Sequence, residues 1–99
     1  MPNDKYAQGR RIEYKVIEYF EKNGYPSAWR TAGSHGPFDV IAISASEIVL
    51  AQVKSYREKM GTYKEDIKKL RKLEVPPSVK KVMVIYKIGK GVERIEEIK

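Results

Sequence analysis

Two apolar stretches in the middle of the chain are rich in β-branched residues and flank a short polar segment. Residues 38–43 read Phe-Asp-Val-Ile-Ala-Ile, and residues 47–54 read Glu-Ile-Val-Leu-Ala-Gln-Val-Lys. The segment Ser44-Ala45-Ser46 between them is typical of a turn. The pattern therefore predicts a β-hairpin.

The register of this hairpin follows if its loop is as short as possible. Asp39 then lies opposite Gln52, and Ile41 lies opposite Leu50. Because side chains alternate along a strand, these residues share one face with Lys54, and this face becomes polar toward the open end. The other face is apolar throughout, so we expect both sides of the sheet to be covered; it holds Val40, Ala42, Val49, Ala51 and Val53.

Residues 6–22 have the spacing of an amphipathic helix. Apolar residues recur at helical intervals, at Ile12, Val16, Ile17 and Phe20. Asn23-Gly24 supplies a stop signal. Glu13 lies within the apolar stripe, where a hydrophobic residue is expected, so its carboxylate needs a partner. Packing of this helix on the hairpin would bring Glu13 close to Asp39 and Gln52.

The second half of the chain predicts another helix and two strands. Thr62 and Glu65 form a capping box that begins the helix. Residues 79–88 and 92–98 alternate as strands, and the charged residues of the last one suit a sheet edge. With a strand that carries Arg30 before the hairpin, the expected order is αβββαββ. This is an α/β fold, a central mixed five-stranded sheet flanked by helices, in a single domain over residues 1–99.

The charge of the chain favours an anionic partner. Twenty Lys and Arg against thirteen Asp and Glu give a net charge of +7 on 99 residues, which is typical of proteins that bind phosphate backbones. One set of basic residues is expected near the open end of the hairpin and its rim: Lys5, Arg10, Arg11, Lys15, Arg30, Lys54, Arg57 and Lys59. A second set between Lys64 and Lys72 is either the solvated face of the second helix or an extension of the same surface.

The polar residues that should converge are ligands of the type that Mg²⁺ binds. The Glu13 and Asp39 carboxylates and the Gln52 amide oxygen are all hard oxygen donors. Two carboxylates about 4 Å apart repel by about 4 kcal/mol at an effective dielectric constant of ~20, so a divalent cation explains their proximity. The sequence thus predicts a divalent-metal site at the open end of the hairpin.

These residues, in this order, resemble the PD-(D/E)XK nuclease superfamily, and most closely its archaeal Holliday junction resolvases. The resemblance is carried by Glu13, Arg30-Thr31-Ala32-Gly33-Ser34, Pro37-Phe38-Asp39 and Gln52-Val53-Lys54, within slightly more than half of the chain. It implies a restriction-endonuclease-like fold and Mg²⁺-dependent hydrolysis of DNA, with Mn²⁺ able to substitute. The implied substrate is branched DNA, the four-way junction, in recombination and repair.

The resemblance also implies a role for each site residue. Glu13, Asp39 and Gln52, with the Val53 carbonyl, would hold one or two Mg²⁺ ions. Lys54 would either orient or deprotonate the attacking water, or stabilise the phosphorane as a fixed cation.

Further residues would contact DNA. Ser34, in the loop 33–36, resembles a mobile-loop serine of the family that contacts the scissile phosphate, and Arg30 would hold the DNA backbone. His35, the only histidine, is a loop residue that could touch phosphate. Arg10, Arg11, Lys54 and Arg57 complete the expected DNA contacts.

One residue departs from the family pattern. Gln52 stands where the family usually has Glu; the amide keeps a carbonyl ligand but lacks the negative charge, so metal affinity should fall. Two other functions therefore stay open. One is a nuclease of the same fold with another DNA target, of repair, viral or restriction type, and the other is a DNA-binding module with weak catalysis.

The same residues also have purely structural interpretations. Lys54 could be a surface residue that extends its amine to water, and Asp39 a turn residue. Glu13 could interact only with the helix dipole, and Ser34 could serve only the conformation of a Gly-Ser loop. The order and spacing of the whole set favour the functional interpretation.

Composition and symmetry set the remaining expectations. There are no cysteines, no apolar run long enough to span a bilayer and no segment resembling a signal peptide, so we expect a cytoplasmic protein that does not act at a membrane. Few Asn and Gln beside 33% charged residues indicate a thermophilic source. A junction-resolving enzyme must cut two strands symmetrically, so the resemblance implies a two-fold homodimer.

Overall fold

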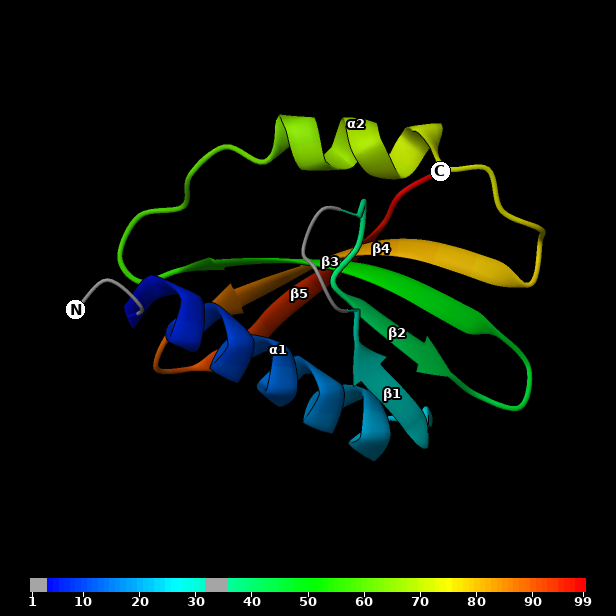
Figure 1. The fold of residues 1–99 in the computed structure, drawn as a ribbon, viewed down its shortest axis with the longest axis horizontal. Helices are drawn as coiled ribbons and strands as arrows, with labels where there is room; N and C mark the ends of the chain where they lie inside the picture. Colours follow the sequence, from blue (N-terminus) through cyan, green and yellow to red (C-terminus); the bar gives the residue numbers. More distant parts are fainter. Residues whose placement is uncertain (1–3, 32–35) are drawn as a thin grey trace.

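Five strands form one mixed sheet with a helix on each face (Figure 1). The structure, a computed structural model, describes residues 4–31 and 36–99. In chain order the elements are α1 (Asp4–Lys22), β1 (Ser27–Arg30), β2 (Val40–Ile43), β3 (Ile48–Tyr56), α2 (Lys64–Lys72), β4 (Val79–Lys87) and β5 (Gly91–Glu97). The predicted fold class and the order αβββαββ are confirmed.

The strands are arranged across the sheet in their order along the chain, from β1 to β5. Only β3 and β4 are parallel, and all other neighbours are antiparallel. Parallel neighbours cannot be joined by a tight turn, and α2 provides the crossover between these two strands. The β2–β3 hairpin has the predicted register in its ladder, with Ile41 paired to Leu50 and Ile43 to Ile48.

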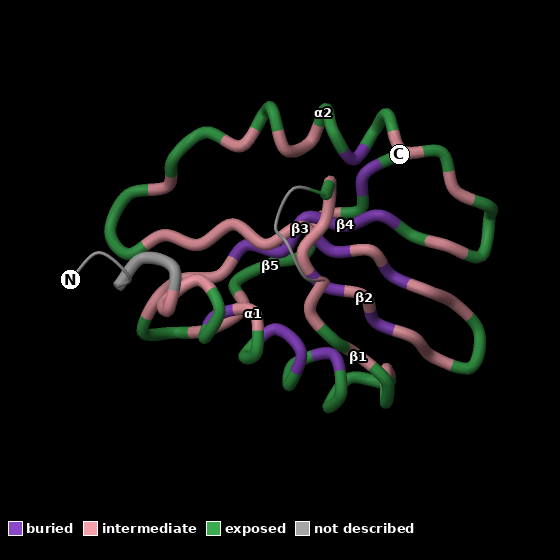
Figure 2. The backbone as a smooth tube through the Cα atoms, in the orientation of Figure 1, coloured by how far each residue is buried: buried purple, intermediate pink, exposed green. Residues whose placement is uncertain are grey.

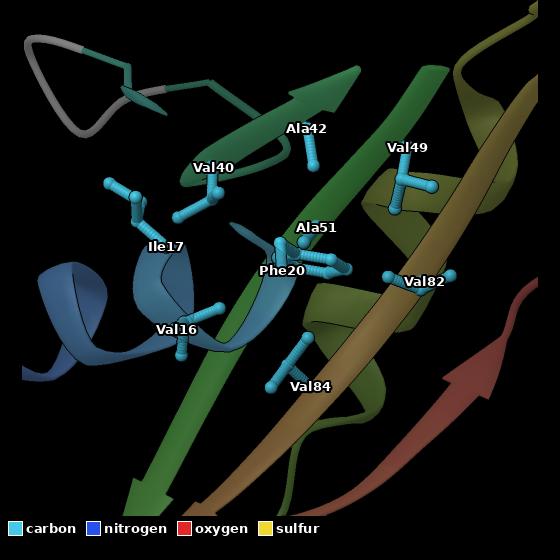
Figure 3. Close-up of a cluster of buried hydrophobic side chains, with 9 residues drawn as sticks. All are labelled: Val16, Ile17, Phe20, Val40, Ala42, Val49, Ala51, Val82 and Val84. Atoms are coloured by element: carbon cyan, nitrogen blue, oxygen red, sulfur yellow. The ribbon is translucent and has the colours of Figure 1, made fainter. Parts of the chain in front are cut away.

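The main core lies between α1 and the sheet (Figure 3). The apolar stripe of α1 packs against β2, β3 and β4, in a cluster of Val16, Ile17, Phe20, Val40, Ala42, Val49, Ala51, Val82 and Val84. Each fully buried Val or Phe side chain contributes about 1.5–3 kcal/mol, so this layer fixes where α1 crosses the sheet. Figure 2 shows the same layer as buried segments along one side of α1 and in the middle of the sheet.

A second, smaller cluster lies under α2. Leu70 packs with Met83, Ile85 and Ile98, and Phe38 and Tyr56 contact the cluster from its rim. Because α2 lies over β4, the second face of the hairpin is covered less completely than expected, and its apolar residues are only half-buried: Ile41, Ile43, Ile48 and Leu50.

The N-terminal end of α2 differs from the prediction. The N-cap is Tyr63, which makes no side-chain capping bond, so the predicted capping box of Thr62 and Glu65 is wrong. Tyr63 is held instead by packing against the cluster under α2. At the other end the buried Lys81 amine of β4 donates to the Leu73 carbonyl (2.8 Å) and to the Arg71 carbonyl (3.4 Å). A lysine from the sheet thus satisfies carbonyls that a helix end leaves without partners.

Within the described part of the chain, neither helix combines the length and the apolar character that crossing a membrane requires.

Candidate active site at the open end of the β2–β3 hairpin

Asp39 lies where the β2–β3 ladder ends. Its backbone N–H donates to the Ala51 carbonyl (2.7 Å), although Ala51 is already the partner of Val40. Asp39 and Val40 thus both face the single residue Ala51, which is the arrangement of a β-bulge. The predicted pairing of Asp39 with Gln52 is therefore wrong. Thr31, at the end of β1, donates its backbone N–H to the Asp39 carbonyl (2.9 Å) and holds the bulged residue from the other side.

The Asp39 side chain takes the place of a ladder partner for β3. Its Oδ2 accepts a hydrogen bond from the Val53 backbone N–H (3.1 Å). The N–H and C=O of one strand residue point to the same side, so the Val53 carbonyl is also directed toward the open end. A carboxylate and a main-chain carbonyl are thereby placed at the same edge of β3.

The environment of Asp39 favours its protonated form. Burial raises the pKa of Asp39 to about 6, against the opposing effect of the Val53 N–H bond. The negative charges of Glu13 and Asp66 contribute to this rise, and the positive charge of Arg30 opposes it. Glu13 belongs to α1 and Asp66 to α2, so acids from both helices act on the same carboxylate. A cation bound here would relieve this repulsion.

Asp66 was not among the predicted site residues. The sequence signal was weak, because an acid in the first turn of a helix is normally explained by the helix dipole. Only the packing of α2 on the sheet brings its charge within range of Asp39.

Glu13 forms an ion pair with Arg30. The Nε–Oε1 distance is 2.7 Å, and the two side chains are only 20% and 24% exposed. The Arg30 guanidinium also lies 5.5 Å from the centre of the Tyr14 ring. Arg30, predicted as a DNA contact, thus has partners within the protein that position Glu13 beside the site.

Gln52 and Lys54 lie on the opposite face of the sheet from α1. They are neighbours of Met83 and Ile85 on β4, which belong to the cluster under α2, whereas Val53 packs on the α1 side. The expectation that the first helix would cover the face of Gln52 is therefore wrong. The Asp39 carboxylate interacts electrostatically with residues on both helices, Glu13 of α1 and Asp66 of α2, so it links the two faces of the sheet.

The side chains of Gln52 and Lys54 are half-buried and available for ligands. Among the residues that the structure describes, neither side chain forms a hydrogen bond or an ion pair. They stand two positions apart on β3, so they share one face on either side of Val53.

The oxygen donors near Asp39 are of the kind that Mg²⁺ binds. Within residues 4–31 and 36–99 there is no cluster of three or more His, Cys, Asp or Glu side chains that could enclose a metal. Mg²⁺ does not require one, because it keeps several waters and commonly binds through one or two carboxylates together with substrate phosphates. The Asp39 carboxylate, the Val53 carbonyl and the Gln52 amide supply hard oxygens. Burial and the negative charges of Glu13 and Asp66 raise the pKa of Asp39, so a cation bound beside its carboxylate would be favoured.

Two predicted site residues, Ser34 and His35, lie outside the described residues. Thr31, the last described residue before them, bonds through Oγ1 to the Phe38 carbonyl (3.0 Å) as well as to Asp39. The chain therefore leaves β1 immediately beside Asp39.

The basic residues of α1 divide between its two flanks. Arg10 is exposed and precedes Glu13 by three residues, so it lies on the flank of the candidate site. Arg11 and Lys15 instead line a recess with Tyr86 and Gly89, on the other flank, and the expectation that they border the site is wrong. Arg57 is exposed just after the end of β3.

Comparison with known proteins finds a solved structure with a similar fold. The structure is similar to that of Hjc from Archaeoglobus fulgidus, a Holliday junction resolvase from an archaeal hyperthermophile, with a TM-score of 0.71 over 89% of this chain and 74% of that chain. The two sequences are 19% identical. No protein-family model and no curated protein sequence matches the chain. The chain thus has the nuclease-like fold of an archaeal Holliday junction resolvase.

Proposed function

We propose that this protein is a metal-dependent DNA endonuclease that cuts branched DNA, as a Holliday junction resolvase does. The observation that carries the proposal is the contact of the Asp39 carboxylate with Val53, between Gln52 and Lys54, in a resolvase fold. The same residues carry the sequence resemblance.

Each residue has a role in this proposal. The Asp39 carboxylate, the Val53 carbonyl and the Gln52 amide hold Mg²⁺, or Mn²⁺ in its place, and Glu13 adds negative charge from α1. When bound, the ion polarises the phosphodiester and lowers the pKa of a water molecule. Arg30 is a positioning residue, because its ion pair fixes the Glu13 carboxylate.

Lys54 is the proposed catalytic cation. It lies on the same face of β3 as Gln52, and its amine would either orient or deprotonate the attacking water or stabilise the negative charge that develops on phosphorus. Ser34 and His35, with Arg10 and Arg57, are proposed to contact the DNA backbone. The active form is proposed to be a cytoplasmic homodimer, because symmetric cutting of a junction needs two sites.

A second candidate function is a DNA-binding module with weak catalysis. It is favoured by the amide at Gln52 and by the ion pair of Glu13 with Arg30. Of the two predicted carboxylate ligands, only Asp39 then has no ion pair within the described part of the chain. A nuclease of the same fold with another DNA target is the remaining alternative.

The choice among these functions can be made with one pair of substrates. Purified protein is incubated with Mg²⁺ and either a four-way junction or a linear duplex of identical sequence, at a fixed salt concentration and with competitor DNA. Preferential cutting of the junction supports the resolvase. Equal cutting of both supports another DNA target, and binding without cutting supports the binding module.

A further inference from the structure

A recess lies on the flank of α1 that faces away from the candidate active site. It has a volume of about 500 Å³ and lies between the C-terminal half of α1 and the turn that joins β4 to β5. A smaller recess of about 150 Å³ shares Lys15, Tyr86 and Gly89 with it, so the two form one continuous groove beside α1. We call this the α1–β5 groove; α1 and the two strands can be followed in Figure 1.

The α1–β5 groove is positively charged. Arg11, Lys15, Lys22 and Lys90 line it, against the single acid Glu18. Glu18 lies 3.9 Å from Lys15, and both side chains are more than half exposed, so this pair neutralises only part of the charge. Four cations on the walls of a concave surface raise the local concentration of a polyanion.

The walls also offer groups that suit a sugar-phosphate chain. Tyr19 and Tyr86 supply aromatic surface with hydroxyl groups. The turn at Gly89 and Gly91 has positive φ angles of 93° and 117°, and there is no heavy atom within 4 Å of where a Cβ would stand. A backbone without side chains at these two positions allows a ligand to approach the turn closely.

The groove and the candidate site are independent surfaces on one helix. Glu13 and Lys15 are two residues apart, and residues with this spacing project from nearly opposite flanks of a helix. About one helix diameter, roughly 10–12 Å, therefore separates the Glu13 flank of α1 from the Lys15 flank, which is comparable with the ~12 Å width of the DNA major groove. One bound DNA molecule can reach both.

We propose that the α1–β5 groove binds the phosphate backbone of DNA outside the site of cleavage. The inference rests on the proposed function only in taking DNA as the polyanion. Its contacts are electrostatic and independent of base sequence, so they position the substrate without specifying it. The groove would thereby hold one segment of the DNA while another segment lies at Asp39.

The test measures binding without cleavage. In the Asp39→Asn background, Lys22→Gln and Lys90→Gln are combined, and the affinity for a labelled four-way junction is measured by fluorescence anisotropy over a range of salt concentrations. Both lysines are exposed, so the fold should be unaffected, and thermal unfolding checks it. The matched control is Lys69→Gln with Lys72→Gln on α2, which removes the same charge from exposed positions and also includes a lysine in the last turn of a helix.

The groove variant should bind at least about tenfold more weakly at low salt, and the slope of log K against log salt should fall by about 1.8, which corresponds to two lost phosphate contacts. The control should change affinity less than about twofold. Lys90→Gln alone, in the exposed turn, should lower the slope by about 0.9. Equal losses in groove and control variants, an unchanged slope, or no DNA binding at all would overturn the inference.

The groove and the nuclease activity can be refuted independently of each other. Binding that depends on the groove, in a protein that never cuts DNA with Mg²⁺, would refute the nuclease and keep the groove. Cutting at the wild-type rate and affinity by the groove variant with Asp39 intact would refute the groove and keep the nuclease.

Discussion

The Asp39 carboxylate accepts a hydrogen bond from the backbone N–H of Val53, across the point where β2 stops pairing with β3. A side chain thus replaces a main-chain partner, and the bulge at Asp39 and Val40 makes this possible. The consequence is a half-buried acid fixed beside an open strand edge, between Gln52 and Lys54. The candidate chemistry of the protein depends on this one contact.

The raised pKa of Asp39 predicts a pH dependence of stability. The folded-state pKa of about 6 lies above the ordinary value of 3.8, so stability from this group is fully present below about pH 4 and is lost as the pH rises through about 6. Asp39→Asn cannot ionise and keeps an oxygen acceptor for Val53. As the pH rises from 4 to 7, the Tm of the wild type should therefore fall relative to that of the variant. Parallel Tm curves would show that Asp39 ionises normally.

Mg²⁺ should offset the loss of stability that ionised Asp39 causes, and it should do so only in the wild type. A ligand that binds the folded state stabilises it in proportion to the logarithm of its concentration, so millimolar Mg²⁺ at pH 7 should raise the Tm of the wild type and leave that of Asp39→Asn unchanged. Differential scanning calorimetry with and without Mg²⁺ measures this, with Glu74→Gln, at an exposed position after α2, as a charge control. An equal rise in all three proteins would indicate binding elsewhere.

Gln52→Glu should lower the Mg²⁺ concentration needed for cleavage. The carboxylate restores the charge that the amide lacks, so half-maximal activity should occur at a lower Mg²⁺ concentration, by about three- to tenfold, with the fold intact. Titration of junction cleavage against Mg²⁺ is the measurement. An unchanged requirement would mean that the side chain at this position does not contact the ion.

The ion pair of Glu13 and Arg30 should contribute measurably to stability and activity. Its short distance and low exposure suggest a coupling of about 1 kcal/mol in a double-mutant cycle of Glu13→Gln and Arg30→Met, read from urea unfolding. Arg30→Met should also slow cleavage, because the Glu13 carboxylate loses its position and the cation that lowers the pKa of Asp39 is removed. The surface pair of Lys68 and Glu65 is the control and should show less coupling.

Lys81 should stabilise the end of α2. Lys81→Met keeps the apolar stem but removes the bonds to the Leu73 and Arg71 carbonyls, and should cost about 1–3 kcal/mol of unfolding free energy. Lys80→Met, next to it, breaks only an ion pair with Glu47 at a partly exposed position and should cost clearly less unfolding free energy than Lys81→Met. If both variants unfold at the same urea concentration, the buried amine does not cap the helix.

Local periodicity was enough to predict both helices, the hairpin ladder and the last two strands. The stripe from Ile12 to Phe20 and the alternation on both sides of Ser44-Ala45-Ser46 reflect burial on one face of one element, which neighbouring residues encode. Predicting the exact position of Asp39 required more, because a bulge depends on how β1 and β2 end together.

Contacts between distant elements could not be predicted in this way. The effect of Asp66 on Asp39, the ion pair of Arg30 with Glu13 and the cap from Lys81 all arise from packing of a helix on a particular part of the sheet. For the same reason the sequence grouped Lys15 with the site, whereas the fold turns it to the other flank of α1.

The most direct test of the nuclease is a comparison of cleavage and binding by the wild type and Asp39→Asn on the same four-way junction with Mg²⁺. The proposal predicts that the wild type cuts the junction, that the variant cuts at least about a thousandfold more slowly, and that the two bind it with similar affinity, because Asn keeps the bond to Val53 while losing the charge that holds the ion. Cleavage by the variant at the wild-type rate, or no cleavage by either protein, would contradict it.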